Sequence, residues 1–126
     1  MIRCVLLATV LAIAAVPAWA QTERKFSAQT LRGELMVTQP PEVLLNRQPA
    51  RLAPGARIRG ADNLLQMSGA LIGQRLLVHF TLDPSGQLLD VWVLNATEAS
   101  RQPWPVTPQQ AATWAFNPDT QSWSRP

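Results

Sequence analysis

The chain has few of the side chains that build metal centres and cross-links. Its 126 residues include one cysteine, one histidine and no tyrosine. A cysteine-ligated zinc site, a cage of several histidines and a disulfide framework are therefore excluded. Charged residues make up only 15% of the chain, which excludes a long charged, disordered tail for most of its length. Hydrophobic residues make up 47%, which is enough for the core of one domain.

The N-terminus has the pattern of a secretory signal peptide. Arg3 precedes an apolar run from Cys4 to Val16, and Ala18-Trp19-Ala20 forms a small-x-small cleavage site. The run is shorter than the roughly 20 residues that a spanning helix needs, and an uncleaved anchor is the alternative. We therefore expect a periplasmic protein that is cut after Ala20 and is then not an integral membrane protein. The expected regions are a signal peptide (1–20), a flexible lead-in (21–30) and a single β-rich domain (31–126).

A β-hairpin is the clearest element in the sequence. The stretch Arg75–Leu82 has an apolar residue at every second position, Asp83-Pro84-Ser85-Gly86 favours a tight turn, and Leu88–Leu94 returns. Two registers are open: Phe80 lies opposite Leu89, or opposite Asp90 if the turn contains a bulge. We prefer the first register because it places the apolar residues on one face.

The other elements are shorter. Apolar stretches predict strands at Leu35–Val37, Glu42–Leu45 and Leu64–Met67, separated by turns at Asn46-Arg47 and Pro54-Gly55. Thr107, Pro108 and Gln110 have the spacing of a helix start, and Asn117-Pro118 ends this helix near Phe116. The sequence predicts an α+β fold: a small β-rich antiparallel meander or partly closed barrel with one short C-terminal helix.

A group of arginines is the main candidate for a binding surface. Arg47, Arg51, Arg57, Arg59 and Arg75 fall in a stretch whose only acidic residues are Glu42 and Asp62. Such a group binds phosphate, anionic headgroups or an acidic peptide, and the alternative is a solvated strand edge that opposes aggregation. Nucleic acid is not expected as a partner, because of the export signal and because no aromatic residues alternate with these arginines.

The tryptophans divide into two predicted groups. Trp92 and Trp114 lie in apolar patterns and are expected to pack in the core. Trp104 lies between two prolines and Trp123 lies near the end of the chain, so we expect both to form contact surface. Trp104 joins Arg47, Arg51, Arg57 and Arg59 as a candidate binding residue.

His79 is the only histidine and admits three interpretations. With Asp90 across the hairpin it would supply two members of a catalytic triad. With Met36 and Met67 it would form a copper site, although methionines in apolar stretches usually fill core. We favour the third interpretation, a histidine on the solvent face of a strand, and predict no catalytic residue, metal or cofactor.

The hairpin and the later stretch Ala-Ala-Thr-Trp-Ala-Phe-Asn-Pro resemble part of the TonB C-terminal domain family. The family is periplasmic and binds peptide segments of outer-membrane receptors, partly by strand addition, which the resemblance implies here. The match covers about a third of the chain, and no strand is expected after Pro118, where the family has one. The whole chain also resembles small exported proteins of Gram-negative bacteria. The matching residues are Phe80, Asp83, Gly86, Val91, Val93, Ala111, Trp114, Phe116 and Pro118.

These patterns together predict a non-catalytic periplasmic module that binds an envelope protein or peptide. The arginine group, strand edges and Trp104 would supply the contacts. The alternative is a periplasmic chaperone for a small ligand or a metal, which would use a cavity of the β-structure. The oligomeric state is left open.

Overall fold

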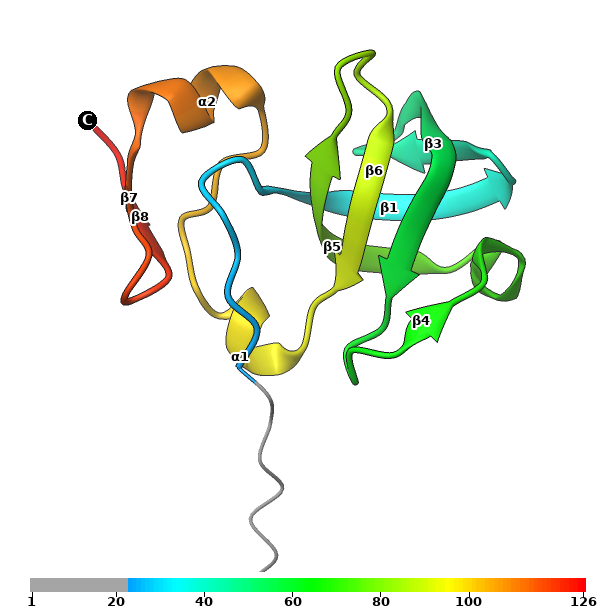
Figure 1. Ribbon diagram of the computed structural model, residues 1–126, viewed down its shortest axis with the longest axis horizontal. Helices are drawn as coiled ribbons and strands as arrows, with labels where there is room; N and C mark the ends of the chain where they lie inside the picture. The colour runs from blue at the N-terminus through cyan, green and yellow to red at the C-terminus, as the bar shows by residue number, and fades with distance from the viewer. Residues whose placement is uncertain (1–22) are drawn as a thin grey trace, which may run out of the picture.

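The computed structural model describes residues 23–126, and Figure 1 shows them as a barrel with a smaller C-terminal unit, residues 96–126, beside it. The signal peptide predicted for residues 1–20 lies outside the described residues. The strands are β1 (Leu31–Gln39), β2 (Glu42–Leu45), β3 (Gln48–Arg59), β4 (Leu65–Gln66), β5 (Arg75–Leu82), β6 (Leu88–Val93), β7 (Ala115–Asn117) and β8 (Ser122–Ser124). The helices are the 3-10 turn η1 (Ser68–Leu71), α1 (Ala96–Ala99) and α2 (Pro108–Thr113).

Five strands form a ring. The sheet order is β2-β1-β5-β6-β3-β4, and β2 also pairs with β3, which closes the sheet on itself. Strands β1, β2 and β3 follow one another as a meander, and β5 returns to pair with β1, so these four strands form a Greek key. Closure leaves few unpaired strand edges. Such barrels serve many functions, and the architecture alone assigns none.

The barrel confirms the prediction of a β-rich, partly closed structure, but the sheet is mixed rather than antiparallel. Strands β3 and β6 run parallel, and their register shifts between Leu52 and Arg57. The turn predicted at Pro54-Gly55 lies within this shift, inside the continuous strand β3, so the prediction of a turn there is wrong. Gly55 has a φ of +78°, which a residue without a Cβ tolerates, and the strand bends without ending.

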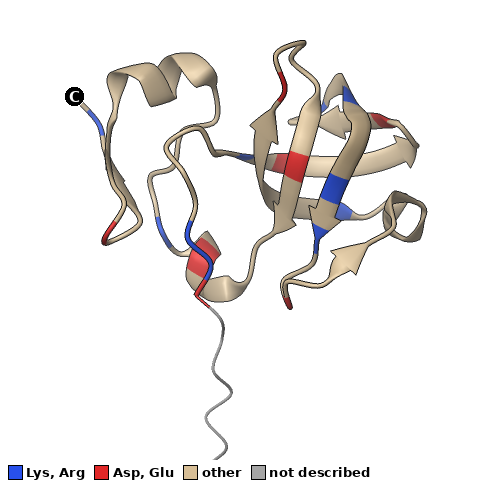
Figure 2. Ribbon diagram, in the orientation of Figure 1, with Lys and Arg blue, Asp and Glu red and all other residues tan. Residues whose placement is uncertain are grey.

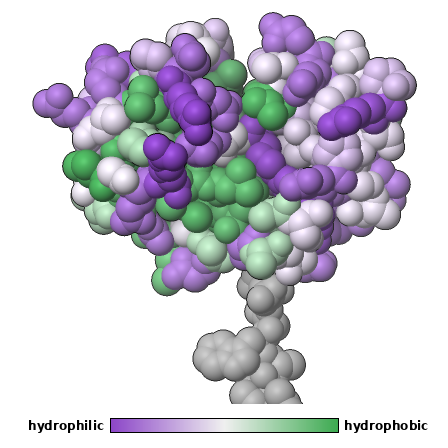
Figure 3. Space-filling model, turned by 180° about the vertical axis from the view of Figure 1, so that it is seen from behind, coloured by the Kyte–Doolittle hydropathy of each residue, from purple (hydrophilic) through white to green (hydrophobic). Residues whose placement is uncertain are grey.

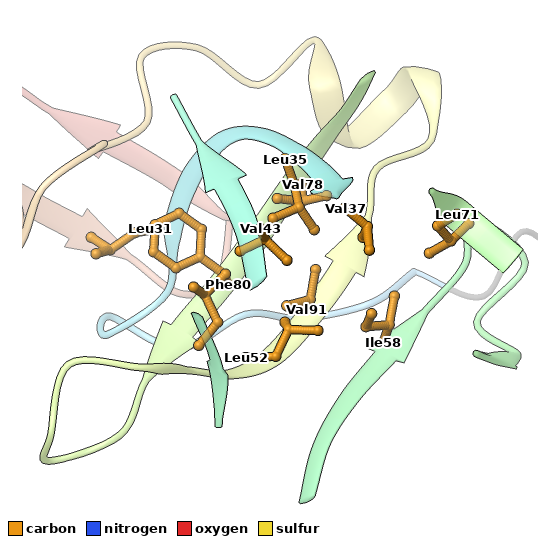
Figure 4. Close-up of a cluster of buried hydrophobic side chains, with 11 residues drawn as sticks. Leu31, Leu35, Val37, Val43, Leu52, Ile58, Leu71, Val78, Phe80 and Val91 are labelled. Atoms are coloured by element: carbon orange, nitrogen blue, oxygen red, sulfur yellow. The ribbon is translucent and has the colours of Figure 1, made fainter. Parts of the chain in front are cut away.

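The core of the barrel consists of the side chains that alternate inward along the strands. Figure 4 shows them meeting from several strands and from η1. Leu35, Val37, Val78 and Val91 are fully buried, and Phe80 fills the space between strands. The complete cluster is Leu31, Leu35, Val37, Val43, Leu52, Ile58, Leu71, Val78, Phe80, Leu88 and Val91.

The predicted hairpin is present, with the bounds of Arg75–Leu82 confirmed and the return strand one residue shorter than predicted, but both predicted registers are wrong. Phe80 lies opposite Val91, not opposite Leu89 or Asp90, because the register shifts between Phe80 and Leu82. The shift turns Leu88 into the core and leaves Leu89 36% exposed. In the turn, Asp83 accepts hydrogen bonds from Ser85 and from the backbone of Gln87, so the loop is longer than the four residues assumed.

A second apolar cluster covers the outer face of β5 and β6. Phe26, Trp104 and Trp123 are its buried members, and Trp92 and Trp114 pack against them. Residues 23–30 run between the barrel and the C-terminal unit (Figure 1). Arg24, Phe26 and Thr30 are buried, so the expectation of a flexible lead-in is wrong for this part of it.

The C-terminal helix begins as predicted and ends earlier. The Thr107 hydroxyl accepts a hydrogen bond from the Gln110 amide, with Pro108 at the first helical position. The helix ends at Thr113, and Phe116 lies in β7, which pairs with β8. A strand after Pro118 is therefore present, against the prediction. None of the helices in residues 23–126 has the length and apolar character to cross a membrane.

Candidate functional site

The predicted arginine group separates into two places. Arg51, Arg57 and Arg59 lie along β3, which Figure 2 shows as blue segments of one strand. Arg47 lies instead in the turn between β2 and β3, where it lines a small hollow together with Arg75. The stretch therefore does not form one continuous basic surface.

The arginines on β3 differ in what they contact. Arg51 donates to Glu42 at 2.9 Å, and both side chains are 54% exposed, so solvent screens this ion pair. Arg57 is exposed and lies opposite Asp90 on β6, the red band next to β3 in Figure 2. Arg59 is half-buried and donates to the backbone oxygen of Asn63 at 3.3 Å. Of these three arginines, Arg59 contacts the segment that follows β3.

Trp104 is not a contact residue. It is 5% exposed, its indole Nε1 donates to the Thr30 carbonyl at 2.9 Å, and its ring stacks on that of His79 at 4.2 Å. Trp123 is also 5% exposed and lies against Trp104. The prediction of an exposed surface at these two tryptophans is wrong, because the C-terminal unit folds back over β5 and β6 and buries both rings.

His79 is buried as well, which overturns the prediction of a solvent-facing histidine. It is 1% exposed, and its ring lies between Trp104 and the edge-on ring of Phe26. Its Nε2 accepts a hydrogen bond from Arg32 Nε at 3.1 Å. Burial, and then the charges of Arg32, Arg24 and Arg101, lowers the pKa of His79 from 6.5 to about 2.

This position removes the two chemical interpretations of His79. Its partner across the hairpin is Trp92 rather than Asp90, so the two triad members are not brought together. Met67 is 80% exposed and does not fill core, whereas His79 is buried. Within residues 23–126 no three His, Cys, Asp or Glu side chains are grouped as a metal site would need.

A buried polar layer, which the sequence patterns did not reveal, surrounds His79. Arg24 donates from Nε to Glu98 at 2.9 Å and forms an ion pair with it. Arg32 donates to the carbonyls of Glu98, in α1, and Arg101, just after it, at 2.8 and 2.9 Å. Glu98 also accepts from the Asn95 amide, which completes a capping box on α1. This layer joins the segment at residues 23–30, the barrel and α1.

An exposed apolar segment, residues 64–72, is the most unusual surface feature of the molecule. Leu64 and Leu65 are each 65% exposed, Met67 is 80% exposed and Ile72 is 52% exposed. Residues 63–74 contain no charged side chain. This absence of charge is visible in the sequence and indicates an apolar surface, whereas the strand predicted at Leu64–Met67 does not. Exposed apolar patches on soluble proteins mark interaction sites. Figure 3, seen from behind the view of Figure 1, shows apolar residues gathered in the middle of that face and polar residues around them.

The described part of the chain also has hollows on its surface. One, of about 420 Å³, lies between α2 and the end of the barrel and is lined mainly by apolar side chains. Its lining residues are Ala28, Gln29, Leu31, Leu82, Pro108, Ala111 and Ala112. Another, of about 180 Å³, lies on the outer face of β1 and β2 and is lined by Glu34, Met36, Leu44, Arg47 and Arg75.

Comparison with known proteins adds no relative to this geometry. No protein-family model, no curated protein sequence and no solved structure matches the chain. The resemblance to the TonB C-terminal domain family therefore stays a prediction, and the function must be argued from the surface of the molecule.

Proposed function

We propose that the chain is a non-catalytic interaction module of the bacterial periplasm that binds an envelope protein or peptide. The observation that carries this proposal is the exposed apolar segment at residues 64–72. Four large apolar side chains in water are unfavourable by the hydrophobic effect, and a partner that covers them recovers this free energy. The periplasmic location rests on the predicted signal peptide.

The apolar segment also offers backbone groups to a partner. Strand β4 pairs with β3 through Ile58↔Gln66 and Arg59↔Leu65, and its other edge carries no strand within residues 23–126. Because the rest of the barrel is closed, β4 is a place where an extended peptide can add to the main sheet. The side chains of Leu65 and Met67 would then supply apolar contacts beside the new strand.

Arginines lie at both ends of the apolar segment. Arg59 contacts Asn63 just before it, and Arg75 begins β5 just after it and is exposed. Their positive charge favours a partner that has acidic residues next to apolar ones, and charge of this kind mainly raises the association rate. We therefore expect binding that is apolar at its centre and salt-sensitive at its rim.

Site-specific photo-crosslinking tests this proposal. A photoreactive amino acid at Met67 is expected to capture a discrete protein from envelope extract, whereas the same group at Ser85, in the exposed β5–β6 turn, captures none. Leu64→Ser combined with Leu65→Ser is expected to weaken this partner at least tenfold, because interface centres dominate binding. The matched control is Leu89→Ser, which removes an exposed leucine elsewhere. Equal capture from Met67 and Ser85 would contradict the proposal.

Charge reversal tests the arginines separately. Arg57→Glu with Arg59→Glu is expected to weaken the captured partner several-fold at low salt and little at high salt, because solvent ions screen exposed charges. Lys25→Glu is the control, since Lys25 is exposed in the segment before the barrel. The free energy of unfolding should change by about 0.5 kcal/mol or less in this control, and by more in the double variant, because Arg59 is half-buried and Arg57 lies opposite Asp90. Weakening that is the same at all salt concentrations would show that these arginines do not act by charge.

The apolar hollow of about 420 Å³ favours a second candidate function, the carriage of a small apolar ligand. Its size falls within the usual range of small-molecule sites. Mass spectrometry of the intact protein from its native envelope would then show a bound molecule. Ala112→Trp, which fills the hollow from α2, is expected to abolish that adduct. A purified chain without any adduct counts against this second function.

A further inference from the structure

We propose that the small hollow on the outer face of β1 and β2 is a binding site for a carboxylate carried on an aliphatic chain. The hollow shares Arg75 with the rim of the apolar segment but contains no residue of that segment, and the inference does not depend on the proposed function. Arg47 and Arg75 line the hollow and bring two positive charges to it, and Met36 and Leu44 are its apolar lining residues.

The strand register explains how these groups come together. Met36 on β1 lies opposite Leu44 on β2 and opposite Arg75 on β5, so the three residues form one row across the outer face. The hairpin turn between β2 and β3 brings Arg47 to the same hollow. The hollow therefore combines two arginines with two apolar side chains, those of Met36 and Leu44. This combination matches a ligand with one charged and one apolar end.

Neither guanidinium is committed to another partner. Within residues 23–126, Arg47 and Arg75 form no ion pair and donate no side-chain hydrogen bond, whereas Arg24, Arg32, Arg51 and Arg59 all do. Glu34 also lines the hollow and leaves it with one net positive charge. A single carboxylate is therefore the group that balances the site, and guanidinium groups bind carboxylates with two parallel hydrogen bonds.

The backbone at Arg47 is a second, independent observation. Asn46 and Arg47 have φ values of 51° and 66°, so both lie in the left-handed region of a two-residue hairpin turn. Glycine is the usual residue at the second position of such a turn, and a side chain there is unfavourable. The arginine is kept at a conformational cost, which is typical of residues that serve a site rather than the fold.

The volume of the hollow limits the ligand to one small group. About 180 Å³ is below the 300–1,000 Å³ of sites for drug-sized molecules. It accommodates one aliphatic residue or a short fatty acid. Two sources share this chemistry: a free aliphatic carboxylate, and the C-terminal residue of a peptide.

Titration by NMR spectroscopy of residues 21–126 tests the site with defined probes. Acetyl-leucine is expected to shift the signals of Arg47, Arg75 and the Met36 methyl group, and acetyl-leucine amide, which has no carboxylate, should not. Hexanoate and acetyl-Ala-Ala-Leu then distinguish the two sources by their relative affinities. Equal binding of the acid and the amide, or shifts elsewhere only, would overturn the proposal.

Arg47→Gly separates binding from folding. The variant relieves the left-handed backbone and should raise Tm by about 4 °C, while it weakens acetyl-leucine at least tenfold. Arg75→Gln should weaken the probe by a similar factor, and the control Arg57→Gln, at an exposed arginine outside the hollow, by less than twofold. Arg47→Gly that binds as tightly as the unchanged protein would show that the guanidinium has no role in the site.

Discussion

The free energy of unfolding is expected to fall by about 2 kcal/mol when the pH is lowered from about 7.5 to 5, because of His79 alone. Its pKa is lowered from 6.5 to about 2 in the folded protein. The unfolded chain therefore binds a proton in this pH range and the folded protein does not. The contribution of His79 to the free energy of unfolding is fully present above about pH 6.5. It is lost as the pH falls toward the folded pKa, at up to about 1.4 kcal/mol per pH unit.

The surroundings of His79 explain why the imidazole stays neutral. The ring is enclosed by Phe26 and Trp104, and Arg32 Nε donates to its Nε2, which must carry no proton. A proton on that nitrogen would break this hydrogen bond and place a cation beside Arg32 and Arg24. The nearest carboxylate in the layer, Glu98, is already bound by Arg24.

Denaturant unfolding between pH 5 and 7.5 measures the effect. No other histidine is present, and ordinary carboxylates titrate below this range, so the window reports on His79. The variant His79→Gln keeps an acceptor for Arg32 and does not titrate, so its stability should be nearly constant between pH 5 and 7.5. An imidazole NMR signal of the folded protein that titrates near pH 6.5 would refute this assignment.

Local patterns predicted the local structure of this chain well. The bounds of Arg75–Leu82 and Glu42–Leu45, the turn at Asn46-Arg47 and the cap at Thr107 all follow from propensity, alternation and turn chemistry over a few residues. The helix predicted to reach Phe116 stops sooner, because residues 115–117 pair with β8, which a local pattern does not show.

The positions of the candidate functional residues could not be predicted from the sequence for a similar reason. An alternating strand predicts one buried and one exposed face, which places His79 in solvent, and the two prolines around Trp104 predict an extended, exposed segment. At His79 both faces of β5 are covered, because Phe26 and Trp104, from segments distant in the sequence, pack against its ring. The exposed apolar side chains at residues 64–72 show the converse: a short strand-like stretch predicts burial, but the closed barrel has no place for it.

Glu98→Gln is expected to lower the free energy of unfolding by about 3–5 kcal/mol. The substitution leaves the guanidinium of Arg24 buried without a carboxylate, and the side chains of this pair are only 6% and 3% exposed. The same arginine also donates to the carbonyls of Gly60 and Val93, at 2.9 and 2.8 Å, so it cannot turn to water without breaking three contacts. The expected loss is a large part of the 5–15 kcal/mol that stabilises a typical domain.

The exposed pair between Arg51 and Glu42 is the matched control. Glu42→Gln removes the same charge from an ion pair with a 2.9 Å contact that is 54% exposed on both sides, so it should cost about 0.5 kcal/mol or less. Hydrogen exchange gives a second measurement: the amides of Phe26 and Thr30 should exchange faster in Glu98→Gln and unchanged in Glu42→Gln. This follows because Arg24 holds residues 23–30 against α1. Similar losses of stability in the two variants would mean that burial does not strengthen the inner pair, and that residues 23–30 are held by the aromatic cluster alone.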